Sequence, residues 1–324
     1  AYHDSGFGTG GFVCVNKGEA VTIDQLDSTG LHKKDDIVFR YVRALKSIFW
    51  YHQSKGLNFI LKLPEALDVH DLKFVDDCFI CVSTGSNEVI WFNAVGERIK
   101  SWKAAGEGDS WHLNCLFNDN GKLFLSAFGE FQNYRQWNGN SRNKGFVLDL
   151  QSNDKVIEGL SGPHQARLIG DTWVICESHT NCLLIISRTG ERHKIRLKGF
   201  PRGFTYDAAY FYVGESINRK TQYNSDVKTS AIVIINRKNF KAVERISIPF
   251  PEIYDIEKIS EGFAGKICLR PEKYSFDFAS ERICLLESQI QNQEMELGRL
   301  KSRVISEKLS VLLNKVKIAV SGRI

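Results

Sequence analysis

Two stretches of the chain decide the fold: Cys78-Phe-Ile-Cys-Val-Ser-Thr-Gly-Ser-Asn-Glu-Val-Ile-Trp-Phe-Asn-Ala-Val-Gly-Glu-Arg98 and Trp173-Val-Ile-Cys-Glu-Ser-His-Thr-Asn-Cys-Leu-Leu-Ile-Ile-Ser-Arg-Thr-Gly-Glu-Arg192. They align almost without gaps. Each consists of an apolar strand, a polar turn, a second apolar strand and a Gly-Glu-Arg turn. Short apolar runs bounded by turn residues are typical of β-strands. The chain therefore contains a repeated pair of strands.

Looser copies of this unit recur along the chain. They are Ile48-Phe-Trp-Tyr51 with Asn58-Phe-Ile-Leu61, Leu123-Phe-Leu-Ser126 with Gly145-Phe-Val-Leu148, Tyr210-Phe-Tyr-Val213 with Ala231-Ile-Val-Ile-Ile235, and Phe263-Ala-Gly-Lys-Ile-Cys268. Starts spaced by roughly 30 to 50 residues match the blade period of a β-propeller. Helical periodicity is lacking before about Phe276. We predict an all-β fold, a six-bladed β-propeller over residues 1–275, with a β-sandwich as the alternative.

The glycine-rich start, Gly6-Phe-Gly-Thr-Gly-Gly11, matches the dinucleotide-binding string G-x-G-x-x-G. In a dinucleotide site that loop follows a strand and opens a helix, so that backbone amides meet the pyrophosphate. Here the glycines precede the strand-like run Phe12-Val-Cys-Val15. We interpret them as a turn that feeds the strand closing the propeller ring.

The C-terminal part has a helical period. Apolar residues recur at steps of three and four, with one polar member: Ile283, Leu286, Ile290, Gln293, Leu297, Leu300 and Val304. This heptad pattern predicts a C-terminal α-helical coiled coil over residues 276–324. A helix of about 40 residues is about 60 Å long, too long to cap one blade. We expect a homo-oligomer joined through the helix 279–320.

Charge and cysteine content exclude several classes of protein. The net charge of +5 in 324 residues is too small to indicate nucleic-acid binding, and no apolar run is long enough to span a membrane. The segment 299–324 carries seven basic residues and one acid, so a cationic helix lying on a membrane is an alternative to a solvated coiled-coil face. Eight cysteines without a secretory segment indicate a reducing, cytoplasmic location. Cys78 and Cys81 lie on opposite faces of a strand, which disfavours a redox pair.

Polar residues stand at matched positions of the repeat. In a propeller the innermost strands begin at the central channel, so residues there converge from all blades. The sequence places Val69-His70-Asp71, Trp111-His112-Leu-Asn114, Pro163-His164-Gln-Ala-Arg167, Pro201-Arg202-Gly203 and Ile253-Tyr254-Asp255 at these positions. The predicted ligand-binding residues are His70, His112, Asn114, His164, Arg167, Arg202, Glu215 and Asp255.

These residues leave four interpretations open. His70, His112 and His164 could bind a transition metal such as zinc or iron. Histidines with Arg167 and Arg202 could instead hold a carboxylate or phosphate. One histidine could perform acid–base chemistry, or the groups could simply close the channel. Calcium prefers several oxygen ligands and is less favoured, although acids and Asn114 could supply some.

A long insertion, Phe128-Gly-Glu-Phe-Gln-Asn-Tyr-Arg-Gln-Trp-Asn-Gly-Asn-Ser-Arg142, is rich in aromatic and amide residues. Such a loop suits a glycan or protein contact, and a packed surface loop is the alternative. A second insertion covers residues 217–226. The chain has no Gly-x-Ser-x-Gly, His-Glu-x-x-His or phosphate-loop string, which removes the common hydrolase, zinc-protease and nucleotide-hydrolysis classes.

Four ordered motifs carry a family resemblance: Asp109-Ser-Trp-His-Leu-Asn-Cys115, Gly162-Pro-His-Gln-Ala-Arg167, Gly199-Phe-Pro-Arg-Gly-Phe204 and Val213-Gly-Glu-Ser-Ile-Asn-Arg219. Over about residues 65 to 255 the chain resembles an uncharacterised bacterial family with a Pro-His-Ser-Pro-Arg signature, in which Gln165-Ala166 here replaces Ser-Pro. More distantly it is similar to six-bladed propellers of the NHL, strictosidine-synthase and gluconolactonase kinds. The resemblance implies a propeller fold and no settled activity.

The sequence thus predicts a propeller that binds a small or anionic ligand at its channel. The first alternative is a metal-dependent hydrolase or lyase that uses the same channel. The second is a scaffold without catalytic activity for protein or glycan partners. Whether the protein is an enzyme stays open at this point.

Overall fold

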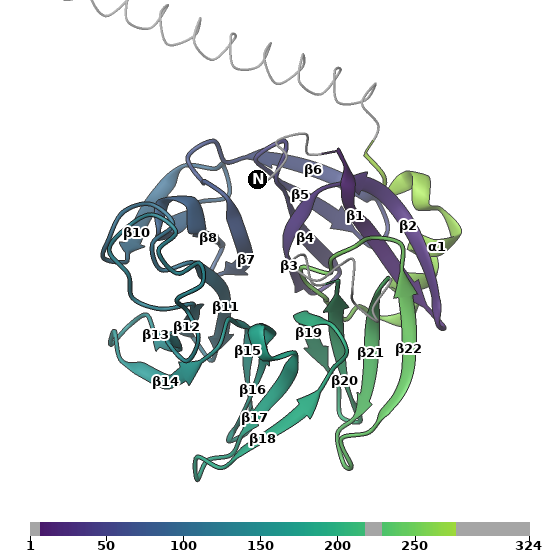
Figure 1. Ribbon diagram of the computed structural model, residues 1–324. Coiled ribbons are helices and arrows are strands. Elements are labelled where there is room, and N and C mark those ends of the chain that lie inside the picture. Colours follow the sequence, from purple (N-terminus) through teal and green to yellow (C-terminus); the bar gives the residue numbers. More distant parts are fainter. Residues whose placement is uncertain (1–6, 218–228, 277–324) are drawn as a thin grey trace, which may run out of the picture. The chain divides into compact units, whose positions relative to one another are not determined.

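The computed structural model describes residues 7–217 and 229–276, and its strands form antiparallel sheets (Figure 1). Five sheets have four strands each. In chain order they are β3 (Ser28–Lys34), β4 (Ile37–Val42), β5 (Ser47–His52) and β6 (Gly56–Lys62); β7 (Val69–Val75), β8 (Cys78–Ser83), β9 (Glu88–Phe92) and β10 (Arg98–Lys103); β11 (Leu113–Asp119), β12 (Lys122–Ala127), β13 (Gly145–Asp149) and β14 (Lys155–Leu160); β15 (Pro163–Ile169), β16 (Thr172–Glu177), β17 (Cys182–Ile186) and β18 (Arg192–Arg196); and β19 (Phe200–Tyr206), β20 (Tyr210–Ser216), β21 (Ser230–Asn236) and β22 (Ala242–Ile248).

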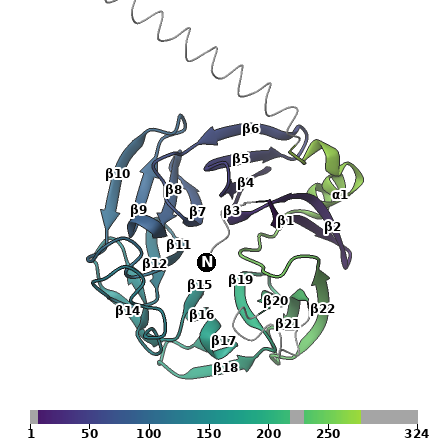
Figure 2. The same cartoon turned by 45° about the horizontal axis from the view of Figure 1, so that its top comes forward.

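The five sheets are arranged around a common axis, with β3, β7, β11, β15 and β19 innermost (Figure 2). The prediction of an all-β propeller is confirmed. The prediction of six blades is wrong, because only five four-stranded blades form in the described residues. The alignment of one repeat with the others is also wrong. Ile48-Phe-Trp-Tyr51 lies in β5, the third strand of its blade, whereas the runs that it was aligned with lie in second strands.

A smaller assembly fills the place between β19–β22 and β3–β6 (Figure 2). It contains the two-stranded sheet of β1 (Phe7–Asn16) and β2 (Glu19–Leu26), the strand-free segment 251–260, and helix α1 (Glu261–Leu269). The backbone amide of Leu31 in β3 donates to Asp255 at 2.9 Å. A Cβ on Gly203 in β19 would lie 3.1 Å from the Asp255 Cα, so the segment passes close to both strands.

Those of the N-terminal glycines that the structure describes do not form the predicted turn. Gly10 and Gly11 lie within β1, whose pairing with β2 shifts register between Phe7 and Phe12. Glycine fits there because a Cβ on Gly11 would lie 2.2 Å from the ring of Phe250.

The last expected strand, Phe263–Cys268, is instead part of α1, so the absence of helix before Phe276 was a wrong prediction. The Ser260 side chain accepts a hydrogen bond from the Phe263 amide at 3.2 Å, which caps the helix. Phe263, Ala264 and Ile267 are buried, and α1 packs against β1. The predicted coiled coil, with its helix 279–320, lies outside the described residues.

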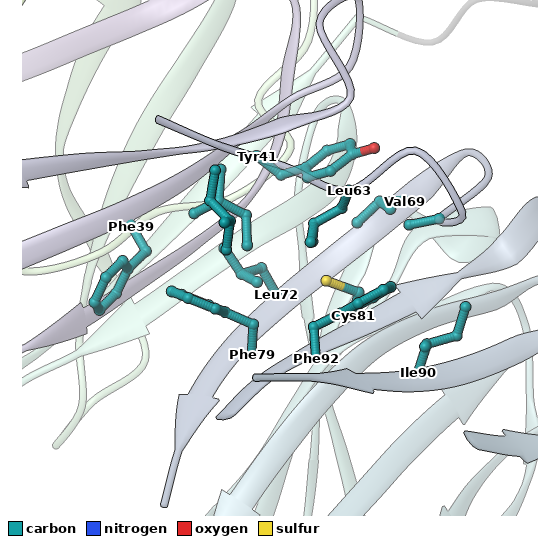
Figure 3. Close-up of a cluster of buried hydrophobic side chains, with 12 residues drawn as sticks. Phe39, Tyr41, Leu63, Val69, Leu72, Phe79, Cys81, Ile90 and Phe92 are labelled. Carbon is teal, nitrogen blue, oxygen red and sulfur yellow. The ribbon is translucent and has the colours of Figure 1, made fainter. Parts of the chain in front are cut away.

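Apolar side chains fill the spaces between neighbouring blades. Figure 3 shows the cluster between β3–β6 and β7–β10, where Phe39, Phe79 and Leu72 are at most 1% exposed. The rings of Phe39 and Phe79 meet edge to face with their centroids 5.2 Å apart. Both blades bury apolar area that neither could bury alone, which stabilises the ring. No helix in residues 7–217 and 229–276 is long and apolar enough to cross a membrane.

Candidate functional site

Every innermost strand departs from regular pairing near its start. The register shifts lie between Thr29 and Leu31, Val69 and Asp71, Leu113 and Leu116, His164 and Arg167, and Pro201 and Phe204. A β-bulge inserts a residue into one strand and re-aims the side chains around it. Four of the five bulges occur at polar positions found in the sequence, so the same local distortion recurs around the channel. The fifth, in β3, was not among those positions, and Ile253-Tyr254-Asp255 lies in the strand-free segment 251–260 instead.

Two of the predicted histidines are in direct contact. The ring centroids of His70 and His112 are 4.9 Å apart, and the rings are perpendicular. The Asn114 side-chain amide donates to the His112 carbonyl at 3.0 Å, which turns its Oδ1 toward His70 Nδ1 at 3.3 Å. This contact orients His70 with its Nδ1 hydrogen toward the amide oxygen. Residues from β7 and the start of β11 thus form one unit.

His112 is paired with an acid. Its Nδ1 lies 2.9 Å from Asp109 Oδ1, and the residues are 4% and 2% exposed. Burial, with the charges of His70 and Arg202, lowers the pKa of His112 well below its usual value. Burial raises the pKa of Asp109 to about 6. At neutral pH the imidazole is therefore neutral, with its hydrogen on Nδ1.

The insertion Phe128–Arg142 covers this pair. The ring centroids of Trp137 and Phe128 are 4.0 and 4.4 Å from that of His112. Trp137 Nε1 donates to the Asp109 carbonyl at 3.0 Å, and Arg135 Nε donates to the Asp109 carboxylate at 3.3 Å. Part of the insertion is therefore packed into the site, and its function in contacting a glycan or protein stays a prediction.

His164 from β15 has a similar arrangement. Its Nδ1 lies 2.7 Å from Ser178 Oγ and 3.2 Å from the Gly162 carbonyl. The Ser178 hydroxyl donates to the Pro201 carbonyl, so it accepts from His164. Burial, and next Arg202, lower the pKa of His164 well below its usual value. Within the described residues, Nε2 of His112 and of His164 makes no hydrogen bond.

Arg202 supplies the cation at this level. It is 7% exposed, and its Nη1 lies 3.2 Å from Glu252 Oε2. Its guanidinium carbon is 3.6 Å from the centroid of Tyr254, whose ring is 6.0 Å from that of His70. Arg202, Tyr254 and the three histidines make up what we call the histidine layer of the channel.

An acid and a second arginine border the histidine layer. Asp68 forms an ion pair with Arg43 at 2.7 Å and lies 3.5 Å from His70 Nε2. Burial alone would raise the pKa of Asp68, but His70 and Arg43 outweigh it and hold the pKa below its usual value. Asp68 is therefore ionised at neutral pH.

A second set of polar side chains, which we call the carboxylate layer, contains the other predicted residues near the axis. Lys73 Nζ lies 2.8 Å from Asp71 Oδ1, and Gln165 Nε2 donates to Asp255 Oδ1 at 2.9 Å. Arg167 donates to Gln165 Oε1. Burial raises the pKa of Asp255 to about 6.

The structure separates one predicted residue from these layers. Glu215 lies near the end of β20, where its Oε1 is 2.6 Å from Arg245 and its Oε2 accepts from the Lys198 amide. Glu177 holds Lys194 in the same way in the preceding blade, at 2.7 Å. This repeated ion pair joins strands within a blade, and we no longer assign Glu215 to the channel.

Sequence reasoning missed Asp109, Trp137 and Asp68 as members of the site. The spacing Asp109-Ser-Trp-His112 was a usable signal, because an acid three residues from a histidine can reach its ring through one turn. Trp137 gave no such signal, since it meets His112 only after the insertion folds back.

The described residues do not group the three histidines as metal ligands. Nowhere in residues 7–217 and 229–276 is there a group of three or more His, Cys, Asp or Glu side chains placed to hold a metal ion. Nδ1 of each of His70, His112 and His164 faces a protein oxygen. The predicted zinc, iron or calcium cofactor therefore has no support in the described geometry.

The chain belongs to the family described as "Domain of unknown function (DUF4915)", which matches residues 59–267. The match covers β7–β22 and most of α1, and it is consistent with an uncharacterised family, while the Pro-His-Ser-Pro-Arg signature stays a prediction. No curated protein matches the chain.

Solved structures with similar folds are propellers or proteins of unknown function. A protein of unknown function from Bacteroides caccae has a TM-score of 0.52 at 8% identity, with 75% of this chain and 96% of that chain covered. Regucalcin from Agrobacterium tumefaciens, a calcium-binding protein, has a TM-score of 0.50 at 14% identity, covering 69% and 75%. A nidogen/laminin complex has a TM-score of 0.53 at 11% identity, covering 72% and 85%. At these identities the likeness concerns the fold.

Proposed function

We propose that the histidine layer binds a small anion that also carries a hydroxyl group, such as a hydroxycarboxylate. The observation that carries this proposal is the convergence of two neutral imidazoles and one guanidinium from three successive innermost strands. His112 and His164 each direct Nδ1 toward a protein oxygen, which leaves Nε2 as the nitrogen that can meet a ligand.

The charges of the layer favour this chemistry. Arg202 stays protonated and can hold a carboxylate by charge-assisted hydrogen bonds. A neutral Nε2 accepts a hydrogen bond but donates none, so it suits a hydroxyl. A ligand with a carboxylate and a hydroxyl group would form hydrogen bonds with the Arg202 guanidinium and with the imidazoles. A ligand with a carboxylate alone would form hydrogen bonds only with the guanidinium.

Acid–base catalysis is the second candidate, and the Asp109–His112 pair favours it. A carboxylate on Nδ1 fixes the tautomer and stabilises the imidazolium that forms when Nε2 takes a proton. In this reaction His112 would remove the proton of the bound hydroxyl. The metal-dependent form of a hydrolase or lyase, predicted from the sequence, finds no metal group in the described part of the chain.

Calorimetric titration of the full chain tests the proposal. The probes are lactate, propionate and inorganic phosphate, and the variants are Arg202→Gln and His164→Gln. We expect lactate to bind more tightly than propionate. Arg202→Gln should weaken lactate binding by about tenfold or more, since a hydrogen bond to a charged group contributes about 1.5 to 3 kcal/mol. His164→Gln should weaken it by about two- to tenfold, since a hydrogen bond between neutral groups contributes about 0.5 to 1.5 kcal/mol. Arg188→Gln is the matched control, because the Arg188 side chain is 83% exposed in the turn between β17 and β18.

Two results would contradict the proposal. One is the absence of binding by all three probes. The other is lactate binding that Arg202→Gln and His164→Gln leave unchanged although both variants remain folded by circular dichroism. Equal affinity for lactate and propionate would remove the hydroxyl from the proposal and leave a simple anion site.

A further inference from the structure

A large cavity lies between the last complete blade and the two-stranded sheet. Its volume is about 980 Å³. It is lined by β1, β3, β4, β21, β22, the segment 250–259 and α1, around the place where the smaller assembly stands between β19–β22 and β3–β6 (Figure 2). A volume of this size is at the upper end of ordinary small-molecule sites.

The cavity follows from the missing blade. In β21 the residues alternate between two apolar faces: Val233 and Ile235 pack into the core of the preceding blade pair, whereas Ile232 and Ile234 line the cavity. Strands that are apolar on both faces are typical of sheets covered on both sides. Here the second cover is only the two-stranded sheet and α1, so an apolar face remains partly uncovered.

The opposite side of the cavity combines apolar and polar side chains, with Arg40 and Tyr51 beside Phe12 and Val38. Ile246 and Ile248 of β22 lie on the same wall as Ile232 and Ile234, because β21 and β22 are paired in one sheet. Lys17 and Glu261 also line the cavity and form an ion pair at 3.4 Å. Both side chains are exposed, so the cavity reaches the surface at this pair.

One polar group in the lining lacks a close partner. The side chain of Glu257 is half-buried, and within the described residues it forms no hydrogen bond and no ion pair. The charges of the carboxylate layer act on the pKa of Glu257. Asp255 and Asp71 raise this pKa, and Lys73 and Arg167 lower it. Burial raises the pKa of Glu257 to about 7. Lys258, which also lines the cavity, is paired with Asp207 at 2.8 Å. Among the remaining groups, the acids Asp71, Asp255 and Glu257 exceed the cations Lys73 and Arg167 by one when all are ionised, so this end of the cavity suits an added cation.

We propose that this cavity is a second ligand site, which shares Tyr254 with the histidine layer and binds an apolar amine with its chain among Ile232, Ile234 and Ile248 and its ammonium group at Glu257. The apolar walls remove the chain from water. The ammonium group supplies the missing cation and donates to the unpaired carboxylate. A fatty carboxylate of the same length would be repelled by the acids at this end of the cavity, so the proposal excludes it as a ligand.

Titration of the full chain with three ligands of equal chain length tests the proposal. The probes are decylamine, decan-1-ol and decanoate, each below its micelle concentration, followed by calorimetry. We expect decylamine to bind about tenfold or more tightly than decan-1-ol, because a charge-assisted hydrogen bond contributes about 1.5 kcal/mol or more. Decanoate should bind least.

Two variants make the test specific. Glu257→Gln should abolish the preference for the amine and leave decan-1-ol binding in place. Ile234→Phe should weaken both ligands by occupying the cavity, and Ile232→Phe repeats the test if the first variant fails to fold. Glu191→Gln, at an exposed turn outside the lining, is the matched control.

The proposal is overturned if no probe binds the folded protein. It is also overturned if decylamine and decan-1-ol bind equally to the unaltered chain, or if Ile234→Phe and Ile232→Phe both leave binding unchanged. Loss of lactate binding in Arg202→Gln concerns the histidine layer and leaves these outcomes unaffected.

Discussion

The guanidinium of Arg202 lies on the ring of Tyr254, with 3.6 Å between the Arg202 Cζ and the ring centroid. The two residues belong to β19 and to the strand-free segment 251–260. Because no sheet hydrogen bonds join these elements, the contact between cation and ring is one of the interactions that hold the segment against the last blade. It also sets the position of the only arginine in the histidine layer as we have defined it.

Replacing Tyr254 with Leu should destabilise the protein by about 1 to 2 kcal/mol, because a desolvated cation–π contact contributes roughly that amount. It should also weaken lactate binding, since Arg202 loses its support. Urea unfolding and calorimetry measure the two effects. Tyr254→Phe keeps the ring and should therefore keep most of the stability and most of the affinity for lactate. Equal losses in the Leu and Phe variants would show that the ring face does not matter.

Replacing Asp109 with Asn should change the tautomer of His112. The carboxylate accepts from His112 Nδ1, and an amide in its place can turn its NH₂ toward the ring instead. We expect the Nδ1-H tautomer of His112 to lose population, and stability to fall by about 1 to 3 kcal/mol because buried donors lose an ionised acceptor. Nitrogen-15 NMR of the imidazole reports the tautomer. Glu107→Gln, at an exposed neighbouring position, serves as control.

The stability of a Glu257→Gln variant should depend on pH differently from that of the unaltered chain. The pKa of Glu257 is raised to about 7 in the folded protein from the usual 4.5, so the folded state holds this proton more tightly than the unfolded state. This group therefore lowers stability as pH rises from about 4.5 to 7. The variant has no carboxyl group at this position, so its free energy of unfolding does not fall in this way. From pH 5 to pH 8 its free energy of unfolding should therefore rise by about 2 kcal/mol relative to that of the unaltered chain.

Urea unfolding at both pH values measures the difference. Taking the difference between the two proteins removes the opposite contribution of His112 and His164, whose lowered pKa values make stability fall as pH drops below about 6.5. A difference that stays constant from pH 5 to pH 8 would mean that Glu257 ionises freely in the folded protein.

Helix α1 should be essential for closing the ring. Phe263 is 1% exposed, and its replacement by Ala should cost about 3 to 5 kcal/mol through lost burial and the cavity left behind. Leu269, in the same helix, is 83% exposed, and its replacement by Ala should stay within about 0.5 kcal/mol. Urea unfolding compares the two variants. Similar small effects would show that α1 contributes little to the fold.

The predicted oligomer through 279–320 can be tested on the full chain. Ile290→Asp places a charge in the predicted heptad seam and should reduce the molar mass in solution to that of one chain, measured by light scattering after size exclusion. Glu294→Gln lies outside the seam and should leave the mass unchanged. A full chain that is monomeric before any substitution would rule out the predicted assembly.

The sequence predicted the parts of the fold that repeat. The runs at Cys78 and Trp173 are nearly identical in pattern, and both are second strands of blades whose first strands begin with a histidine motif. The alignment of the repeats alone predicted that His70, His112 and Arg202 lie close together, because residues at corresponding positions of successive blades meet at the axis.

The parts that do not repeat could not be predicted in the same way. Phe263-Ala-Gly-Lys-Ile-Cys268 is apolar and short, and such a run has the same appearance in a strand and in a buried helix. The Ser260 cap, three residues before Phe263, was the discriminating signal. The bulges near Asp71 and Arg167 depend on pairing with a neighbouring strand, which is a tertiary property. The stacking of Trp137 on His112 likewise depends on how a long loop returns.

The contact between β1 and α1 joins residues that are far apart in the sequence: Cys14 Sγ lies 3.8 Å from the Ala264 carbonyl, 250 positions away. Contacts of such long sequence separation form late, because the intervening chain must be ordered first. During synthesis on the ribosome, the hairpin of β1 and β2 would have to wait until α1 had been made before it found this partner. Until then the first and last blades would each present an unprotected apolar edge, and a chaperone acting on nascent chains would have its natural target there.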